Sequence, residues 1–143
     1  MQVFTYVRIS EDRTGEEAGV ERQQEDCRAF AERLGLEVWE SFRDNDVSAY
    51  KKKKRPEYEA MMDRVRLAAT TIIVWHVDRL YRRPRELEDL IDLVETHSIR
   101  IEAVKGGAFD LNTHEGRLMA RQLVAIASYE SGHKADRIRR ANL

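Results

Sequence analysis

Two short stretches of the chain carry residues that could act together on a phosphate group. The first is Tyr6-Val-Arg8-Ile-Ser10, in which an arginine stands two residues before a serine. Guanidinium groups bind phosphate oxygens through paired hydrogen bonds, and a hydroxyl held beside such a group could act as a nucleophile. An Arg-x-Ser pattern at a strand end also fits a solvated edge, so this stretch alone does not establish a site.

Residues 78–82 (Asp-Arg-Leu-Tyr-Arg) form the second stretch, which adds Arg79 and Arg82. A structural surface seldom gathers several permanently charged side chains that repel one another, whereas an anionic ligand with several oxygens accounts for them. Asp78 could pair with both arginines and fix their rotamers, or it could be an ordinary helix N-cap. Two arginines of the intervening segment are also available, Arg55 and Arg64.

The elements expected around these stretches are those of an α/β domain. Residues 1–10 alternate with the period of two that is typical of a strand, so Tyr6, Arg8 and Ser10 share one of its faces. The other predicted elements are strands over residues 36–42, 70–77 and 99–104, and amphipathic helices over residues 17–34, 56–67 and 84–97.

Strands that alternate with helices predict a mostly parallel sheet of four to five strands with helices on both faces. In such sheets a ligand binds beyond the carboxyl ends of the strands. Ser10 follows the first predicted strand, and residues 78–82 follow the strand over residues 70–77. We therefore expect the serine and the arginines to meet at one edge of the sheet.

Two intermediate segments are open to two interpretations each. Gln23 lies on the polar side of the first predicted helix, near the expected path of the Ser10 loop, where it is either solvated or part of the site. Residues 44–55 are predicted to form a loop that ends in five consecutive cations, residues 51–55. These cations are either solvated or in contact with a polyanion.

The chain ends in a predicted helix from residue 113 to about residue 140, with Asn112 or Thr113 as its N-cap. Its length of about 40 Å exceeds what a core of this size can cover. Packing on the sheet explains its first half, but the basic second half has nothing left to pack on. We expect residues 113–143 to contact another subunit or domain beyond the α/β domain of residues 1–112. An apolar stripe marks the first half: Leu118, Met119, Leu123, Ile126 and Ala127.

Composition limits the other possibilities. The 143 residues are 36% charged and 42% hydrophobic with a net charge of −1, which fits one soluble domain and excludes a uniformly basic chain. No apolar run approaches the roughly 20 residues of a membrane span, and no signal-peptide pattern is present, so a cytoplasmic protein is expected. The single cysteine, Cys27, excludes an internal disulfide. Without metal-ligand spacing or a glycine-rich phosphate loop, no metal or cofactor is expected.

The order of the motifs resembles the catalytic domain of the serine recombinases, a family that includes resolvases, DNA invertases and large phage integrases. The resemblance covers essentially the whole chain, and the segment from Ser10 to Cys27 is most similar to the large integrases. The similar segments are Tyr6-Val-Arg8-Ile-Ser10, Val20-Glu-Arg-Gln23, Arg55-Pro-Glu57, residues 78–82 and residues 109–119.

This resemblance implies a site-specific recombinase that cuts and rejoins DNA. Ser10 would attack a DNA phosphate, form a 5′-phosphoserine link and release a 3′-hydroxyl. The arginines that would hold the scissile phosphate are Arg8, Arg79 and Arg82, with Arg55 as a further positive contact. Other positions that match site residues are Gln23, Asp78 as the organiser of the arginines, Tyr6, Arg64 where resolvases have a lysine, and Glu130 of the long helix.

Similar proteins assemble from dimers into tetramers and bind DNA through a separate domain after the long helix. The resemblance therefore implies a homodimer to homotetramer formed through residues 113–140, with sequence selectivity supplied by a C-terminal domain outside this sequence. The alternative is a catalytically silent, flavodoxin-like dimerisation module. The set of Ser10 with Arg8, Arg79 and Arg82 favours the enzyme. Arginines can stabilise phosphoryl transfer by position and charge, but no histidine is suitably placed as the base for Ser10.

Overall fold

The structure is a computed structural model that describes residues 2–9, 16–45 and 55–141; for residues 9, 16–18, 20, 45 and 131–141 it describes the backbone alone. The elements in chain order are β1 (Gln2–Ile9), α1 (Glu16–Arg33), β2 (Glu40–Asn45), α2 (Pro56–Val65), β3 (Thr70–Val74), the 3-10 helix η1 (Val77–Arg79), α3 (Pro84–Thr96), β4 (Ile99–Ala103) and α4 (His114–Ala141).

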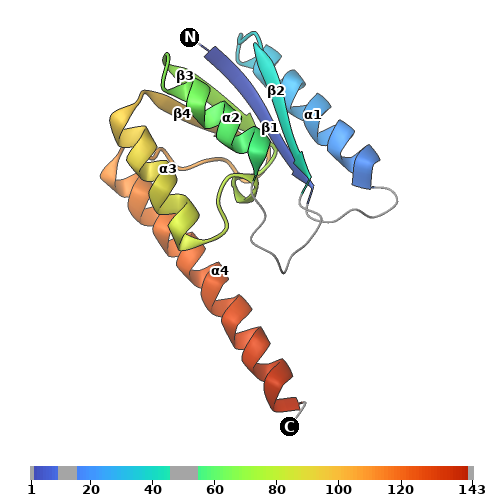
Figure 1. Ribbon diagram of the computed structural model, residues 1–143, viewed down its shortest axis with the longest axis vertical. Helices are drawn as coiled ribbons and strands as arrows, with labels where there is room; N and C mark the ends of the chain where they lie inside the picture. Colours follow the sequence, from blue (N-terminus) through green and yellow to red (C-terminus); the bar gives the residue numbers. More distant parts are fainter. Residues whose placement is uncertain (1, 10–15, 46–54, 142–143) are drawn as a thin grey trace.

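The described strands form one parallel sheet in the order β2-β1-β3-β4 (Figure 1). This arrangement confirms the predicted α/β fold and places β1 between β2 and β3. Tyr6 is in register with Val74, the last residue of β3, so Arg8 lies beyond the end of that strand. On the other side, Arg8 is in register with Asp44 of β2.

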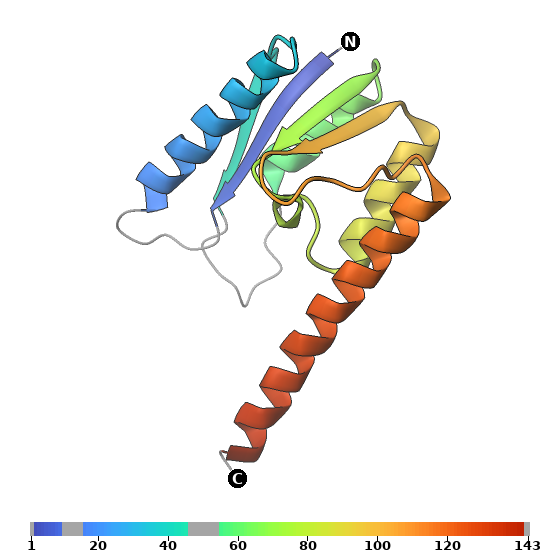
Figure 2. The same ribbon diagram turned by 180° about the vertical axis from the view of Figure 1, so that it is seen from behind.

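Helices cover both faces of the sheet (Figures 1 and 2). On one face, Val3 and Ile73 pack with Cys27 and Ala31 of α1. The opposite face is covered by α2 and α3. Because successive side chains of a strand alternate between faces, the even-numbered residues of β1 point to this face. This larger core includes Phe4, Tyr6, Met61, Ile72, Val74, Leu87, Leu90 and Ile91.

Two strands differ from their predicted bounds. β2 is shifted along the chain, so that Asp44 and Asn45, predicted to begin a loop, are its last residues, and β3 is shorter than predicted. Gly35, with a φ of 72°, ends α1 as expected, but β2 begins only at Glu40 because the chain first crosses to β1, where the Trp39 N–H donates to the Val3 carbonyl at 2.8 Å. β3 ends at Val74 because the His76 imidazole accepts the Asp78 N–H at 3.1 Å and turns the chain into η1.

The long terminal helix is confirmed as α4, and the Thr113 hydroxyl caps it by accepting the Gly116 N–H at 3.0 Å. α4 runs beside α3 and then extends past the sheet (Figures 1 and 2). Among the α4 residues whose burial is described, 114–130, Ala120 and Val124 are the ones that belong to the core, so the apolar stripe does not cover the sheet as predicted for this half. Four stripe residues are 45% to 57% exposed: Leu118, Met119, Leu123 and Ile126.

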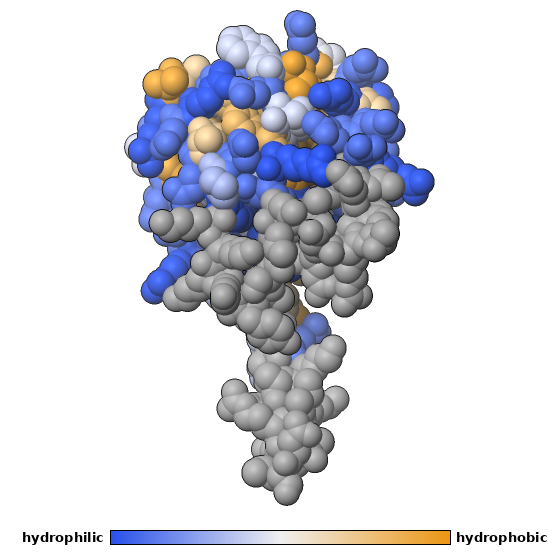
Figure 3. All heavy atoms as spheres, turned by 45° about the vertical axis from the view of Figure 1, so that its right-hand side comes forward, coloured by the Kyte–Doolittle hydropathy of each residue, from blue (hydrophilic) through white to orange (hydrophobic). Residues whose placement is uncertain are grey.

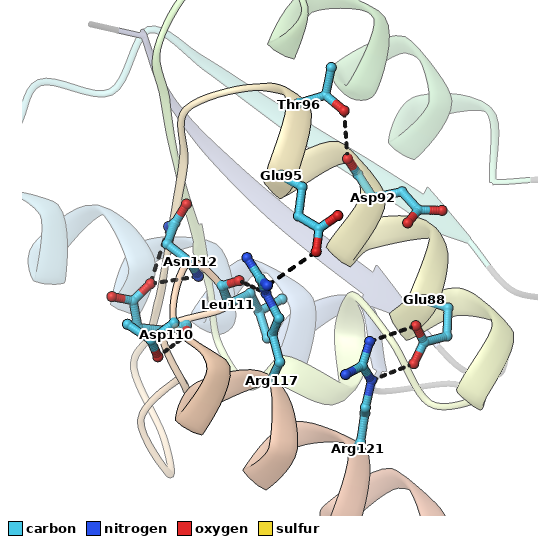
Figure 4. A network of polar contacts seen from close by, with 10 residues as sticks. Glu88, Asp92, Glu95, Thr96, Asp110, Leu111, Asn112, Arg117 and Arg121 are labelled. Carbon is cyan, nitrogen blue, oxygen red and sulfur yellow. Dashed lines mark hydrogen bonds and ion pairs between the residues drawn. The ribbon is translucent and has the colours of Figure 1, made fainter.

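Two ion pairs join α4 to α3 (Figure 4). Arg121 donates to both carboxylate oxygens of Glu88, at 2.7 and 2.9 Å. Arg117 lies 3.1 Å from Glu95 and donates to the Leu111 carbonyl at 2.7 Å. These contacts fix the direction in which α4 leaves the domain.

The surface of the described part of the domain is largely hydrophilic with scattered apolar residues in the view of Figure 3. Among the helices described here, none combines the length and the apolar character needed to cross a membrane.

Candidate active site

Asp44 of β2 lies beside the carboxyl end of β1 and organises it. This residue is only 4% exposed. Its Oδ2 accepts the Tyr6 hydroxyl at 2.8 Å and the Tyr58 N–H at 2.9 Å, and its Oδ1 accepts the Glu57 N–H at 3.0 Å. A negative charge is favourable at a helix N-terminus, so one carboxylate ties β1 and β2 to the start of α2. Burial, together with Asp44, raises the pKa of Tyr6 far above its ordinary value and keeps this hydroxyl protonated.

Arg55 precedes α2 and has a side chain that is only 12% exposed. Its Nη1 donates to the carbonyls of Arg79 and Leu80 at 3.2 and 3.1 Å, and its Nη2 lies 3.2 Å from Oε2 of Glu86. The guanidinium also stacks over the Tyr58 ring, 3.8 Å from its centroid. The structure thus places Arg55 against the segment that carries Arg79.

Asp78 pairs with Arg79, one of its two expected partners, at 3.5 Å between Oδ1 and Nη1, whereas no ion pair with Arg82 is found among the described residues. The same carboxylate oxygen lies 3.2 Å from Nδ1 of His76. The alternative role of Asp78 as an N-cap is not observed, because the N-cap of η1 is His76. The Arg79 side chain is 16% exposed and lies over the Trp75 ring, so its guanidinium is held between an acidic and an aromatic group.

Three of the predicted site residues have a buried polar atom that makes no hydrogen bond to another described residue. These atoms are Oε1 of Gln23, Oδ1 of Asp78 and Nε of Arg79. Buried polar atoms in proteins nearly always have a hydrogen-bond partner. Such a buried Nε donor in a guanidinium suits a phosphate oxygen as its partner.

Arg82 is exposed and lines a cleft of about 720 Å³ together with Asp78 and His76. Leu123 and Val124 of α4 form part of the wall of this cleft. The cleft therefore joins the segment after β3 to the long helix. Within the described part of the chain, no three His, Cys, Asp or Glu side chains are grouped to hold a metal ion.

The structure brings Arg8, Tyr6, Arg55, Asp78, Arg79 and Arg82 to the carboxyl edge of the sheet. Ser10 and the cations of residues 51–54 lie outside the described residues.

Two predicted site residues lie elsewhere. Arg64 occupies the last turn of α2 at the other end of the sheet, where it pairs with Glu40 and lies over the Phe4 ring. Glu130 is exposed on α4, without a hydrogen bond or ion pair to another described residue.

Two residues of this site, Asp44 and Glu86, were not among those predicted from the sequence. Glu86 is the third residue of α3, a helix that begins with Pro84, and a glutamate at this position often caps a helix. Its contact with the start of the helix could therefore have been predicted from the local sequence. Asp44 had no such signal, because its partner Tyr6 is 38 residues away in the sequence.

Solved structures of several recombinases share this fold. The N-terminal catalytic domain of TP901-1 integrase is 22% identical with a TM-score of 0.68, over 95% of this chain and 98% of that chain. A resolvase family site-specific recombinase from Streptococcus pneumoniae is 17% identical with a TM-score of 0.66, over 99% of this chain and 93% of that chain. The C-terminal catalytic domain of ISC1926 TnpA, an IS607-like serine recombinase, is 24% identical with a TM-score of 0.60, over 74% and 69%.

No curated protein sequence was found to match the chain. The family model for the resolvase N-terminal domain, in contrast, matches residues 3–142. This match spans nearly the whole chain and includes every residue that the structure brings to the carboxyl edge of the sheet. The chain therefore belongs to the resolvase family of serine recombinase catalytic domains.

Proposed function

We propose that this domain cleaves and rejoins DNA in a recombinase of the large-integrase type, with Ser10 as its nucleophile. The observation that carries this proposal is that Arg8 lies near the end of β1, the strand that leads to Ser10, while Arg79 and Arg82 lie in the segment that follows the neighbouring strand β3. A phosphate held by several guanidinium groups beside a serine is the arrangement that such a reaction requires.

The reaction balances without a nucleotide or an oxidant. The Ser10 Oγ gives up its proton and attacks phosphorus, the bond from phosphorus to the 3′-oxygen breaks, and the leaving oxygen takes a proton to become the 3′-hydroxyl, so the proton count is unchanged. The 5′-phosphoserine ester keeps the energy of the phosphodiester, so attack by a 3′-hydroxyl rejoins the DNA and frees the serine. The arginines neutralise the charge that builds on the phosphate oxygens in both directions.

The other expected site residues have supporting roles in this proposal. Asp78 orients Arg79 through the ion pair between them, and Tyr6 positions the end of β1 through Asp44. Gln23 stays a candidate for a polar contact with DNA, since its Oε1 makes no hydrogen bond to another described residue. The locations of Arg64 and Glu130 give no support for direct contact within one domain.

We also propose that α4 mediates assembly of the homodimer and of the homotetramer. The exposed apolar residues of this helix support self-association, because such a stripe is unfavourable in water. Sequence-selective DNA binding would come from a further domain after α4, and the reaction on DNA would take place in the cytoplasm. A few phosphate contacts alone give weak, salt-sensitive binding.

The test uses the whole recombinase and a DNA substrate that traps the cleaved intermediate. Wild-type protein is expected to form a covalent protein–DNA adduct on a denaturing gel, and Ser10→Ala is expected to form none. Ser98→Ala, which changes an exposed serine before β4, serves as the matched control and keeps the adduct. An adduct that persists in Ser10→Ala contradicts the proposal, and DNA binding without any wild-type adduct favours the silent dimerisation module.

A further inference from the structure

We propose that Glu86 is a positioning residue, which holds the segment of Arg79 and Arg82 where these arginines can bind the scissile phosphate. This inference rests on the proposed function, because it concerns the same site. Glu86 lies in the first turn of α3, and its side chain is 24% exposed. Its two carboxylate oxygens bind different parts of the chain.

Oε1 of Glu86 accepts hydrogen bonds from the backbone N–H groups of Arg82 and Arg83, at 3.2 and 3.1 Å. Contacts of this kind are common where a glutamate caps the start of its own helix. Here they also fix the peptide group of Arg82, one of the proposed phosphate ligands. This oxygen therefore sets the point from which the Arg82 side chain extends.

Oε2 of Glu86 binds Arg55, whose sequence position is far from α3. Helix capping does not require this second contact. Because Arg55 also donates to the carbonyls of Arg79 and Leu80, the segment is held at both ends. Its first carbonyls bind Arg55, its last amides bind Glu86, and the ion pair of Arg55 with Glu86 closes the connection.

The connection continues to the strand that leads to Ser10. Arg55 stacks on Tyr58 in the first turn of α2, and the Tyr58 N–H binds Asp44. Asp44 in turn accepts the Tyr6 hydroxyl of β1. Glu86 thus links the arginine segment after β3 to the end of β1 through contacts of mostly buried side chains. A displacement of about 1 Å in such a site can lower a rate by about 100-fold.

The experiment measures two quantities on the whole recombinase: the rate of adduct formation in a single turnover, and DNA affinity by electrophoretic shift. Glu86→Gln keeps an acceptor for the amides but removes the charge that pairs with Arg55, and Glu86→Ala removes both. We expect adduct formation to fall about 10-fold in Glu86→Gln and about 100-fold in Glu86→Ala, with affinity changed by less than about 3-fold. Glu32→Gln, at the exposed end of α1, is the matched control and keeps the wild-type rate.

A second substrate separates positioning from loss of folded protein. A methylphosphonate at the scissile position is neutral, so well-placed arginines contribute less to its cleavage. The slowing caused by Glu86→Ala should therefore shrink markedly on this substrate, whereas partial unfolding would slow both substrates equally. Equal slowing on both, or a wild-type rate of Glu86→Ala on DNA, would overturn the inference. An adduct in Ser10→Ala would instead overturn the proposed function.

Discussion

The hydroxyl of Tyr6 donates a hydrogen bond of 2.8 Å to Oδ2 of Asp44 across the β1–β2 pair. Tyr6 is in register with Phe42, and Asp44 follows two residues later on the same face of β2. The same carboxylate receives two N–H groups at the start of α2, just after Arg55. The location of Arg55, and through it that of the arginine segment, therefore depends on one buried carboxylate.

Asp44→Asn is expected to destabilise the domain although the side chains have the same shape. The carboxylate accepts three hydrogen bonds with two oxygens, whereas an asparagine has one acceptor oxygen and an NH₂ group that only donates. At least one buried donor loses its partner, which lowers the free energy of unfolding by about 2–4 kcal/mol in urea titrations followed by circular dichroism. Asp92→Asn, at an exposed position of α3, should change the free energy of unfolding by less than about 0.5 kcal/mol. Equal stability of the two variants would contradict this account of Asp44.

Alkaline pH should destabilise the domain through its buried tyrosines. Burial raises the pKa of Tyr58 and of Tyr81 to about 12, and it raises that of Tyr6 as well. Groups with a raised pKa in the folded state stabilise it fully below the unfolded value of about 10, and this stabilisation is lost as the pH rises toward the folded value.

We therefore expect the urea midpoint of the wild type to fall between about pH 10 and about pH 12. Tyr6→Phe should be less stable at neutral pH, because it lacks the bond to Asp44, but its midpoint should fall less steeply in this window. Tyr129→Phe changes a tyrosine that is 72% exposed and should keep the wild-type slope. Parallel slopes for wild type and Tyr6→Phe would exclude this role of Tyr6.

Local sequence patterns were sufficient to predict most of the helices and strands. Pro56 and Pro84 begin α2 and α3, and Gly35 ends α1, as their conformational preferences require. The ends of β2 and β3 were predicted wrongly because they depend on contacts outside the strand pattern. The imidazole of His76, for example, binds the backbone two residues ahead and stops β3.

The site was predictable at its strand ends but not in its supporting contacts. Charge and strand order placed Arg79 at the correct edge, because parallel strands bring their carboxyl ends together. The partners of Asp44 and of Glu86 lie on other elements, so no periodic pattern records them. Arg64 looked equivalent to Arg55 in the sequence, yet α2 runs opposite to the strands and carries Arg64 to the other end of the sheet.

The ion pair of Arg121 with Glu88 should contribute stability that is lost in acid. Its hydrogen bond lowers the pKa of Glu88, so the contribution is present above the ordinary glutamate value and disappears as the pH falls through the folded value. Glu88→Gln should lower the urea midpoint slightly at pH 7, and this difference should shrink from about pH 5 to about pH 3. Glu37→Gln, which changes an exposed glutamate, is the control and should have the urea midpoint of the wild type both at neutral pH and in acid. A difference that persists in acid would rule out the charge of Glu88 as its cause.

Arg82 and Arg83 provide a matched pair, because both are exposed and both line the cleft beside α4. Of the two, only Arg82 is proposed above to bind the scissile phosphate. We expect Arg82→Ala to lower the rate of adduct formation on the order of 100-fold, and Arg83→Ala by less than about 3-fold. Arg82→Lys should recover little, since an ammonium lacks the paired donors of a guanidinium. Similar losses at both positions would mean that overall positive charge, not a specific contact, matters here.

Self-association should depend on the apolar stripe of α4. Ile126 is 57% exposed and does not belong to the described core, so Ile126→Glu should leave the fold of the domain unchanged. Burial of a charge at an apolar interface is strongly unfavourable, so the dissociation constant of the dimer should rise at least about 10-fold in sedimentation velocity experiments. Gln122→Glu adds the same charge at an exposed polar position of the same helix, and its dissociation constant should rise much less. If the two variants dissociate alike while circular dichroism shows both folded, the dimer uses a different face of the molecule.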